Sequence, residues 1–288
     1  IEHAHPEHRA LVASTTYVSM CMGILLGLIT ELGLRFMLPE NEVEEWAWRI
    51  PFVCVSLMGV IGLYIRLFLS ESPAYKYAKL HSNLSATPIR DVFVKNYHIV
   101  LQSIALYSTV ATAFYTIVIY VKNFMQTILF YPAYEAIIIN SITLIIIMLV
   151  TPMAAAISDK IGRIPILVLG LLLIVVTLYP ALWLLLRGGF ILPLLSQMIM
   201  AVALSFYLGP MPAALAELFP TRIRFTGVAV SYNFTAGLGG LLPLFGFYVM
   251  KLTGDYYFIA YFISITNVLS MSAIFFFKES YRKEILYN

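Results

Sequence analysis

The residues best suited to chemistry in this chain are charged side chains placed between long apolar runs. Asp159 and Arg163 lie four residues apart, with Gly162 between them. Glycine permits a tight turn between two helices, so this acid and this base can pair with charges at neighbouring helix ends. Such pairs could lock one end of a helical bundle. The plainer alternative is that Lys160 and Arg163 only mark the cytoplasmic side of a membrane.

Patterns for covalent or metal chemistry are weak. His3, His5 and His8 lie near the start of the chain, without cysteine or clustered carboxylates beside them, so they predict no metal site. The apolar runs contain no cluster of His, Asp and Glu and no nucleophile–base pair. We therefore expect no cofactor and no enzyme; a membrane-embedded hydrolase is the rival, which metal-dependent hydrolysis would reveal. Cys21 and Cys54 fall in apolar runs and predict no disulfide.

The composition is that of a membrane protein. Hydrophobic residues make up 61% of the 288 residues and charged residues 11%, against about 45–50% and about 25% in soluble domains. A disordered chain is excluded because disorder requires low hydrophobicity and high charge. The net charge of +3 is too small to suggest nucleic-acid binding.

Eight apolar runs are long enough to cross a bilayer as helices. They are continuous and do not alternate as barrel strands do. The sequence therefore predicts an all-α polytopic membrane protein. The runs cover about 10–30, 50–70, 99–121, 134–156, 164–186, 190–215, 225–250 and 256–277.

The orientation follows from the basic residues. Most Lys and Arg residues fall on the side that holds both termini, which the positive-inside bias makes cytoplasmic. We expect a multi-pass protein of the inner or plasma membrane. In the cytoplasmic loop 71–98, Thr87-Pro88 predicts a short amphipathic helix at the membrane surface, with Ile89, Val92 and Phe93 on one face. An unstructured connector is the alternative.

An internal repeat relates the two ends of the chain. Glu2 precedes Arg9 by seven residues before the first span, as Glu217 precedes Arg224 before the seventh. Similar Glu-Ser signals follow the second span (71–72) and the eighth (279–280). Spans 1–2 thus look like a copy of spans 7–8, six spans apart, as in secondary transporters built from two six-helix halves. Chance similarity is the alternative.

The repeat predicts the domain organisation. Residues 1–70 would be the last two helices of an N-terminal half, 71–98 a central loop, 99–278 a complete six-helix half and 279–288 a cytoplasmic tail. Because the chain begins with polar residues and not with Met, we expect a four-span segment before it.

Four stretches resemble the major facilitator superfamily, and more narrowly its metabolite:proton symporters, which include proline/glycine-betaine transporters. The resemblance covers the whole chain, aligned to family helices 5–12, and implies a truncated facilitator fold. The stretches are Trp46-Ala-Trp48-Arg49-Ile-Pro51-Phe52, Glu71-Ser72-Pro73, Ser158-Asp159-Lys160-Ile-Gly162-Arg163 and Glu217-Leu-Phe-Pro220-Thr-Arg222-Ile-Arg224-Phe-Thr-Gly227.

The resemblance implies a network of charges that gates the cytoplasmic side. Its candidates are Asp159, Gly162, Arg163, Glu217, Arg222 and Arg224. Ile164 and Pro165 stand where the family usually has a further basic residue, which weakens the network. A solvated helix end is the alternative for the last three candidates, because exposed ion pairs are each worth only about 0–1 kcal/mol.

The resemblance also implies that spans 3 and 6 line a solute cavity. The candidates are polar side chains of spans 3, 6 and 7: Thr112, Tyr115, Thr116, Tyr120, Gln197, Tyr207 and Asn233, with Ser205 beside them. Bonding between helices is the alternative role for each of them. An aromatic wall would suit a quaternary ammonium solute through cation–π contact.

The expected function is symport of a small polar organic solute, such as proline or betaine as an osmolyte, with protons. A sugar or organic-ion porter and an inactive or split transporter are the alternatives. The expected partners are the bilayer, the solute, the proton and the four-span segment. No Asp or Glu lies mid-membrane, and the resemblance places the coupling carboxylates in earlier helices.

Glu31 and Arg35, one turn apart, are expected to be an interfacial pair; a buried pair on the solute route is the alternative.

Overall fold

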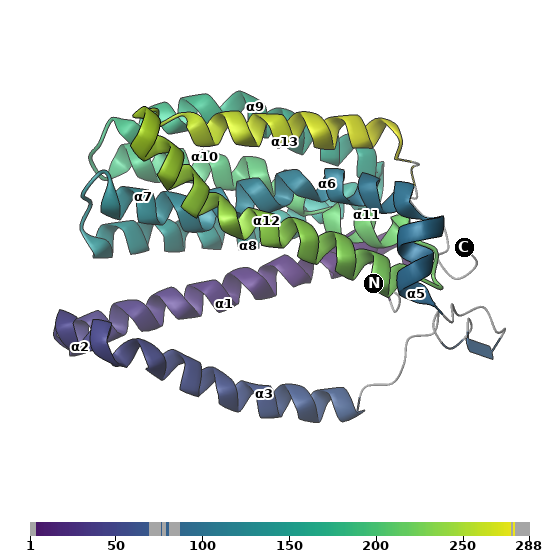
Figure 1. The fold of residues 1–288 in the computed structure, drawn as a ribbon, viewed down its shortest axis with the longest axis horizontal. Helices are drawn as coiled ribbons and strands as arrows, with labels where there is room; N and C mark the ends of the chain where they lie inside the picture. Colours follow the sequence, from purple (N-terminus) through teal and green to yellow (C-terminus); the bar gives the residue numbers. More distant parts are fainter. Residues whose placement is uncertain (1–3, 69–75, 77–78, 81–86, 278, 280–288) are drawn as a thin grey trace.

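The computed structural model describes residues 4–68, 76, 79–80, 87–277 and 279, and their regular structure is helical (Figure 1). Eight helical segments of this part are long and apolar enough to span a membrane, which confirms the all-α, eight-span prediction. They are Pro6–Met37, Ala47–Ile65, Tyr97–Thr127, Ala133–Ile161, Arg163–Leu186, Ile191–Leu218, Arg224–Thr253 and Phe258–Phe275.

The surrounding hydrocarbon explains why the long segments are helical. In hydrocarbon every backbone N–H and C=O needs an internal partner, and a helix supplies it within one segment. The long helices are α1 (Arg9–Met37), α3 (Ile50–Phe68), α6 (Tyr97–Tyr115), α8 (Ala133–Ile161), α9 (Arg163–Leu186), α10 (Ile191–Leu208), α12 (Arg224–Thr253) and α13 (Phe258–Phe275).

Short elements connect or extend these helices. They are η1 (Pro6–His8), α2 (Glu40–Glu45), η2 (Ala47–Arg49), α5 (Pro88–Arg90), η3 (Asp91–Lys95), η4 (Thr116–Tyr120), α7 (Val121–Thr127) and α11 (Met211–Leu218). Gly162, at φ 110°, ends α8 and begins α9 with no further linker, as the tight-turn prediction requires. Its conformation is one that residues with a Cβ rarely adopt.

Helices α6 to α13 form one bundle around a continuous apolar core (Figure 1). Helix α6 packs against α12 and α13, while α10 packs against α8 and α9. Helix α1 lies against α8 and α11. In Figure 1, α1 meets the bundle near the marked N-terminus and leans away toward α2. None of the side chains described in α3 is buried.

The third span changes its winding about two thirds of the way along its length. η4 is a π-helical segment between α6 and α7. Such a segment leaves backbone groups out of the regular ladder, and the Asn140 side chain of α8 donates from Nδ2 to the Val118 carbonyl at 2.6 Å. The apolar run in the sequence gives no sign of this irregularity.

Part of the central loop is helical, as predicted, over residues 88–95 in α5 and η3. The three apolar residues predicted to share a face differ in burial. Val92 is buried against Phe219 and Ile223, whereas Ile89 and Phe93 are exposed. Most of the rest of 71–98, together with Glu2, His3 and Ser280, lies outside the described residues, and so does Glu71-Ser72-Pro73.

Two glycines test how closely the helices are packed. A Cβ at Gly170 of α9 would lie 2.6 Å from the Tyr207 backbone nitrogen in α10, whereas a Cβ at Gly237 of α12 would meet nothing within 4 Å. Alanine gains about 1 kcal/mol over glycine in helix propensity at either site, but overpacking costs about 1–3 kcal/mol.

We therefore expect opposite effects on stability. Gly170→Ala should lower the thermal unfolding midpoint of the purified protein in detergent by several degrees, and the matched control Gly237→Ala should leave it unchanged or raise it. Equal midpoints for the two variants would contradict the observed contact between α9 and α10.

Candidate functional site

Four buried charges converge at the end of the bundle where α1 begins, here called the Arg9 end. Arg9 Nη1 lies 3.1 Å from Glu217 Oε1, and Arg163 Nη2 lies 3.4 Å from the same oxygen. Arg163 Nη1 also lies 2.6 Å from Asp159 Oδ1. The four side chains are between 0% and 4% exposed. Two acids balance two bases, as buried charges require.

Asp159 also holds the first turn of α1. Its Oδ1 and Oδ2 accept the backbone N–H groups of Ala10 and Leu11 at 3.0 and 2.9 Å. A carboxylate at a helix N-terminus satisfies unpaired donors and complements the helix dipole. The start of α1 is thus bound by its backbone to α8 and by the Arg9 side chain to α11.

Small residues permit this close approach. Ala10 and Ala13 of α1 pack against Ala155 of α8 and Ala213 of α11, with at most 3% of any of the four exposed. Small side chains let membrane helices approach until their backbones are close. The Arg9 end is closed between α1 and the bundle.

The predicted gate residues have three different settings. Asp159, Arg163 and Glu217 come together as predicted from the sequence. Gly162 forms the turn beside them, next to Glu279, whose carboxylate oxygens accept the backbone N–H groups of Arg163 and Ile164 at 3.1 and 3.0 Å.

The other two predicted gate residues lie elsewhere. Arg224 is buried, but its Nε donates to the carbonyls of Ala216 and Phe219 at 3.0 and 3.2 Å, which closes the turn after α11. Arg222 is exposed. Sequence reasoning missed Arg9 as a member of the site, although the repeat had singled it out as the counterpart of Arg224.

A second ionic contact joins α1 to the bundle at its other end, here called the Glu31 end. Glu31 Oε2 lies 3.0 Å from Lys122 Nζ of α7, and Glu31 Oε1 lies 3.3 Å from Arg35 Nε. The side chains of Glu31 and Lys122 are 29% and 16% exposed. The expected interfacial pair of Glu31 and Arg35 is therefore part of a bridge between two helices, which the sequence did not indicate.

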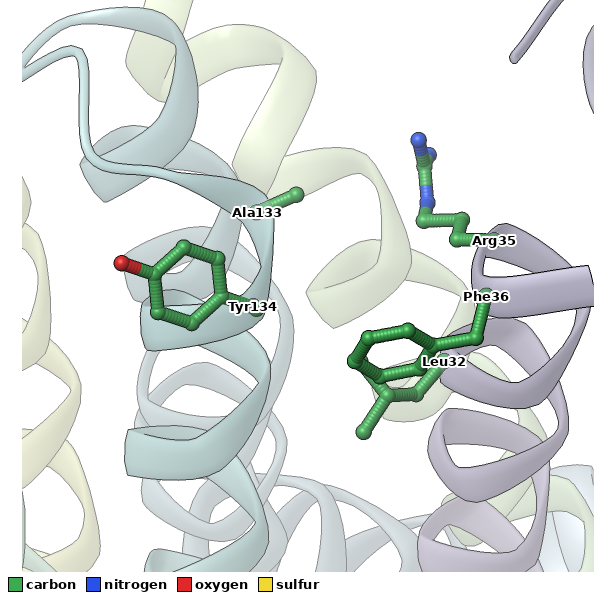
Figure 2. A pocket seen from close by; sticks show the side chains of 5 residues that line it. All are labelled: Leu32, Arg35, Phe36, Ala133 and Tyr134. Carbon is green, nitrogen blue, oxygen red and sulfur yellow. The ribbon is translucent and has the colours of Figure 1, made fainter. Parts of the chain in front are cut away.

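At the Glu31 end α1 and α8 stand apart. Figure 2 shows a cavity between them, lined by Leu32 and Phe36 of α1 and by Ala133 and Tyr134 of α8, with Arg35 at its edge. Its volume is about 280 Å³. The same two helices that touch through alanines at the Arg9 end are thus separated by a cavity at the Glu31 end.

The predicted solute-cavity residues fall into two groups. The first group is engaged inside the bundle: Thr112 Oγ1 lies 2.8 Å from Thr266 Oγ1, Tyr207 donates to the Leu106 carbonyl at 2.7 Å, and the Tyr120 ring packs against Phe247 of α12. These contacts match the alternative role of bonding between helices.

The second group keeps polar atoms or ring faces available. Among the described residues, Thr116 Oγ1 and Gln197 Oε1 are buried without a hydrogen-bond partner. Tyr115 is partly exposed and packs beside Gly239 and Gly240, and Asn233 is exposed with its Nδ2 bonded to Ala229 of its own helix.

Three tyrosines that sequence reasoning had not selected meet between α1, α6 and α12. The Tyr17 hydroxyl donates to the Tyr107 hydroxyl at 3.0 Å. The ring centroids of Tyr107 and Tyr232 are 5.3 Å apart. With 19 tyrosines in the chain, no local pattern distinguishes these three. Within the described residues, no three His, Cys, Asp or Glu side chains are placed to hold a metal ion.

Comparison with known proteins agrees with this architecture. The family model described as Major Facilitator Superfamily matches residues 1–243, and the chain belongs to that superfamily. Its relatives are the metabolite:proton symporters that the motifs predicted, and they are transporters, not enzymes.

Two of the relatives are named for different solutes. The glycine betaine/proline/ectoine/pipecolic acid transporter OusA of Dickeya dadantii is 26% identical over 99% of this chain and 58% of its own. The citrate-proton symporter of Klebsiella pneumoniae is 26% identical over 94% of this chain and 61% of its own. The chain thus spans a little over half the length of the curated relatives it matches.

A solved structure shares the fold. The proton:xylose symporter XylE, bound to 6-bromo-6-deoxy-D-glucose, superposes with a TM-score of 0.76 over 99% of this chain and 67% of its own. At 16% sequence identity, this likeness concerns the fold alone.

The buried network yields a prediction about the Arg9 end. Glu217→Gln keeps the shape of the side chain but removes the charge that Arg9 and Arg163 share. Loss of one partner of a buried pair costs about 3–5 kcal/mol, so this end should open. The probe is Ser14→Cys, a nearly isosteric change at a fully buried site of α1, in a Cys21→Ala/Cys54→Ala background.

Maleimide labelling of Cys at position 14 should become about tenfold faster, or more, in Glu217→Gln. The matched control is Arg222→Gln, which removes an exposed charge of the same region and should leave the rate unchanged. An unchanged rate in Glu217→Gln would show that the network does not close this end.

The bridge at the Glu31 end should be weaker. Lys122→Gln removes a partly exposed contact worth up to about 1 kcal/mol, so labelling of Ala133→Cys in the cavity wall should become up to about fivefold faster. The double reversal Glu31→Lys/Lys122→Glu should restore the original rate, and Lys251→Gln, an exposed lysine of α12, is the control. If Ala133→Cys is labelled as fast in the double reversal as in Lys122→Gln, the contact is not an ionic bridge.

Proposed function

We propose that the protein acts as a secondary transporter by alternating access, carrying a small zwitterionic solute such as proline or glycine betaine together with protons. The observation that carries the proposal is the asymmetry of α1. It is closed against α8 at the Arg9 end by buried charges and alanines, and separated from α8 by a cavity at the Glu31 end.

A rigid α1 couples these two ends. Its 29 residues span about 43 Å at about 1.5 Å per residue, so a tilt that closes the Glu31 end opens the Arg9 end. Opening separates Asp159 from the first turn of α1 and Glu217 from Arg9, and water then hydrates the released charges. This exchange of one closed end for the other is the rocking motion of carriers with a central site.

The side of each end follows from the basic residues. We assign the Arg9 end to the cytoplasm, with both termini there, because the Lys and Arg residues concentrate on that side. The conformation described here then has its cytoplasmic end closed and faces outward.

The names of the relatives point to two classes of solute, zwitterions and a tricarboxylate. The distribution of charges along the spans favours a zwitterion. Citrate requires several cationic groups, as carboxylates are held best by Arg and Lys. The central parts of the eight spans contain no Lys, Arg, His, Asp or Glu. A zwitterion with no net charge suits such spans better than a tricarboxylate does. The sugar porter has no comparable observation in its favour.

The proposal includes a further four-span segment. The chain covers 56–61% of the relatives' length in the cases compared, and its first two spans repeat the last two. We propose that residues 1–70 belong to an N-terminal half with four more helices and that residues 99–278 form the other half. The carboxylates that carry protons would then lie in the four additional helices, since the spans described here have none in their middle.

Uptake measurements test this function. Cells producing the full natural chain should accumulate labelled glycine betaine or proline in a saturable way, and a protonophore should abolish accumulation. Excess citrate or xylose should not compete. Replacement of sodium by potassium should have no effect, and sodium-dependent uptake would contradict proton coupling. Choline is not used as the replacement because it could itself compete with the solute. Competition by citrate would move the protein to the other solute class.

A further inference from the structure

The tyrosine cluster of Tyr17, Tyr107 and Tyr232 lies inside the membrane-spanning helices, about a third of their length from the Arg9 end. Helices α1, α6 and α12 all begin at the Arg9 end, and the three residues lie eight to ten positions after those starts. At about 1.5 Å per residue this is about 12–15 Å along the helices, whose spans are 30 to 32 residues long, so the cluster lies nearer the Arg9 end than the Glu31 end.

Only one of these rings has a large accessible face. Tyr17 and Tyr107 are 3% and 5% exposed, whereas Tyr232 is 39% exposed and packs against Tyr107 from the α12 side. Tyrosines of membrane proteins gather at the interface with water, where the hydroxyl is hydrated. Tyr232 instead lies about two helical turns inside its span, with its ring only partly covered.

The surroundings of Tyr232 are aromatic and uncharged. Tyr107 lies behind it, and the partly exposed Tyr115 lies further along the same side of α6, against Gly239 and Gly240. No Asp, Glu, Lys, Arg or His occurs at this depth in α1, α6 or α12. A cationic group that enters here meets ring faces and hydroxyls and no carboxylate.

We propose that Tyr232, backed by Tyr107, binds the quaternary ammonium group of the solute through its ring face. This inference rests on the proposed function for the class of solute and names the residue that recognises it. Attraction between a cation and an aromatic face requires no fixed negative charge, so the site holds the cationic group of a zwitterion without a matching carboxylate.

The hydrogen-bonded hydroxyls of Tyr17 and Tyr107 provide a contact for the other end of the zwitterion, its carboxylate. Tyr107 accepts the proton of Tyr17, so its own hydroxyl proton is available for another acceptor, because a phenol both accepts and donates. The carboxylate of the solute is that acceptor. One tyrosine pair thus serves the two ends of a zwitterion, with the ring side facing the ammonium group and the hydroxyl side facing the carboxylate.

The experiment separates the ring from the hydroxyl at position 232. Tyr232→Phe keeps the aromatic face and Tyr232→Leu removes it. Tyr248→Leu, on the same helix and 61% exposed, is the matched control. KM for labelled glycine betaine is measured in the full chain, and equilibrium binding of labelled glycine betaine is measured on the purified protein.

We expect Tyr232→Leu to raise KM about 2- to 30-fold, the range that a cation–π contact supports. Tyr232→Phe and Tyr248→Leu should stay within about twofold of the natural protein. A second probe is 3,3-dimethylbutyrate, the uncharged-carbon counterpart of glycine betaine. It should compete poorly in the natural protein, and the difference between the two compounds should shrink in Tyr232→Leu.

Two results would overturn the inference: an unchanged KM in Tyr232→Leu, or equal increases in the Phe and Leu variants. Either result with intact uptake leaves the proposed transport function in place. Binding that depends on the Tyr232 ring without any uptake would support the inference and refute the transport function. A natural protein that neither binds nor transports glycine betaine would refute both.

Discussion

The Glu217 carboxylate is the constraint on which the arrangement of the helices depends. One of its oxygens lies within 3.4 Å of both Arg9 and Arg163, and Asp159 neutralises the second guanidinium. In a protein that is mostly apolar, four buried charges are tolerated only as a complete set, because removal of one member leaves an unpaired charge. The start of α1, the end of α8, the start of α9 and the end of α11 must therefore meet at one point.

The packing along α1 follows from that point. Near the network the contact residues are alanines, and the helix backbones can approach closely. Toward the other end, Leu32 and Phe36 line a cavity opposite Tyr134, and the remaining link is the bridge from Glu31 to Lys122. The strong link is buried and made of several contacts, while the weak link is partly hydrated. A helix held in this unequal way has one preferred closed end, and a modest free energy decides the state of the other.

The eight spans could be predicted from the sequence because hydrocarbon imposes a length and an apolar composition on each of them. The turn at Gly162 and the grouping of Asp159, Arg163 and Glu217 could also be read, the turn from local spacing and the full grouping from family resemblance. Arg9 could not, since its partner is 208 positions away and no local pattern encodes that distance. Arg224 shows the reverse: the repeat suggested that it corresponds to Arg9, yet it bonds two carbonyls left open after α11.

The candidate solute residues were harder to choose for a physical reason. Hydroxyls and amides in a membrane bundle bond to neighbouring helices unless the packing leaves them free, and the sequence does not contain the packing. Thr112 and Tyr207 are engaged between helices, while Thr116 and Gln197 keep buried atoms without partners in the described chain. Residues of the same type, a few positions apart, thus have different roles. The tyrosine cluster was missed because its members come from three helices and share no spacing.

The placement of charges at the ends of the spans and not in their middle fits what the proposed transport requires of the two regions. At the ends, ion pairs can break because water enters and hydrates the separated charges. In the middle, a fixed charge would have to be neutralised in every state, including the one in which the solute has left, and that cost is large in a medium of low polarity. Rings and hydroxyls avoid this difficulty. In the proposed carrier, Tyr107 and Tyr232 would attract a cationic group when it is present and pack against each other when it is absent, so the uncharged middle of the spans would serve both the loaded and the empty state.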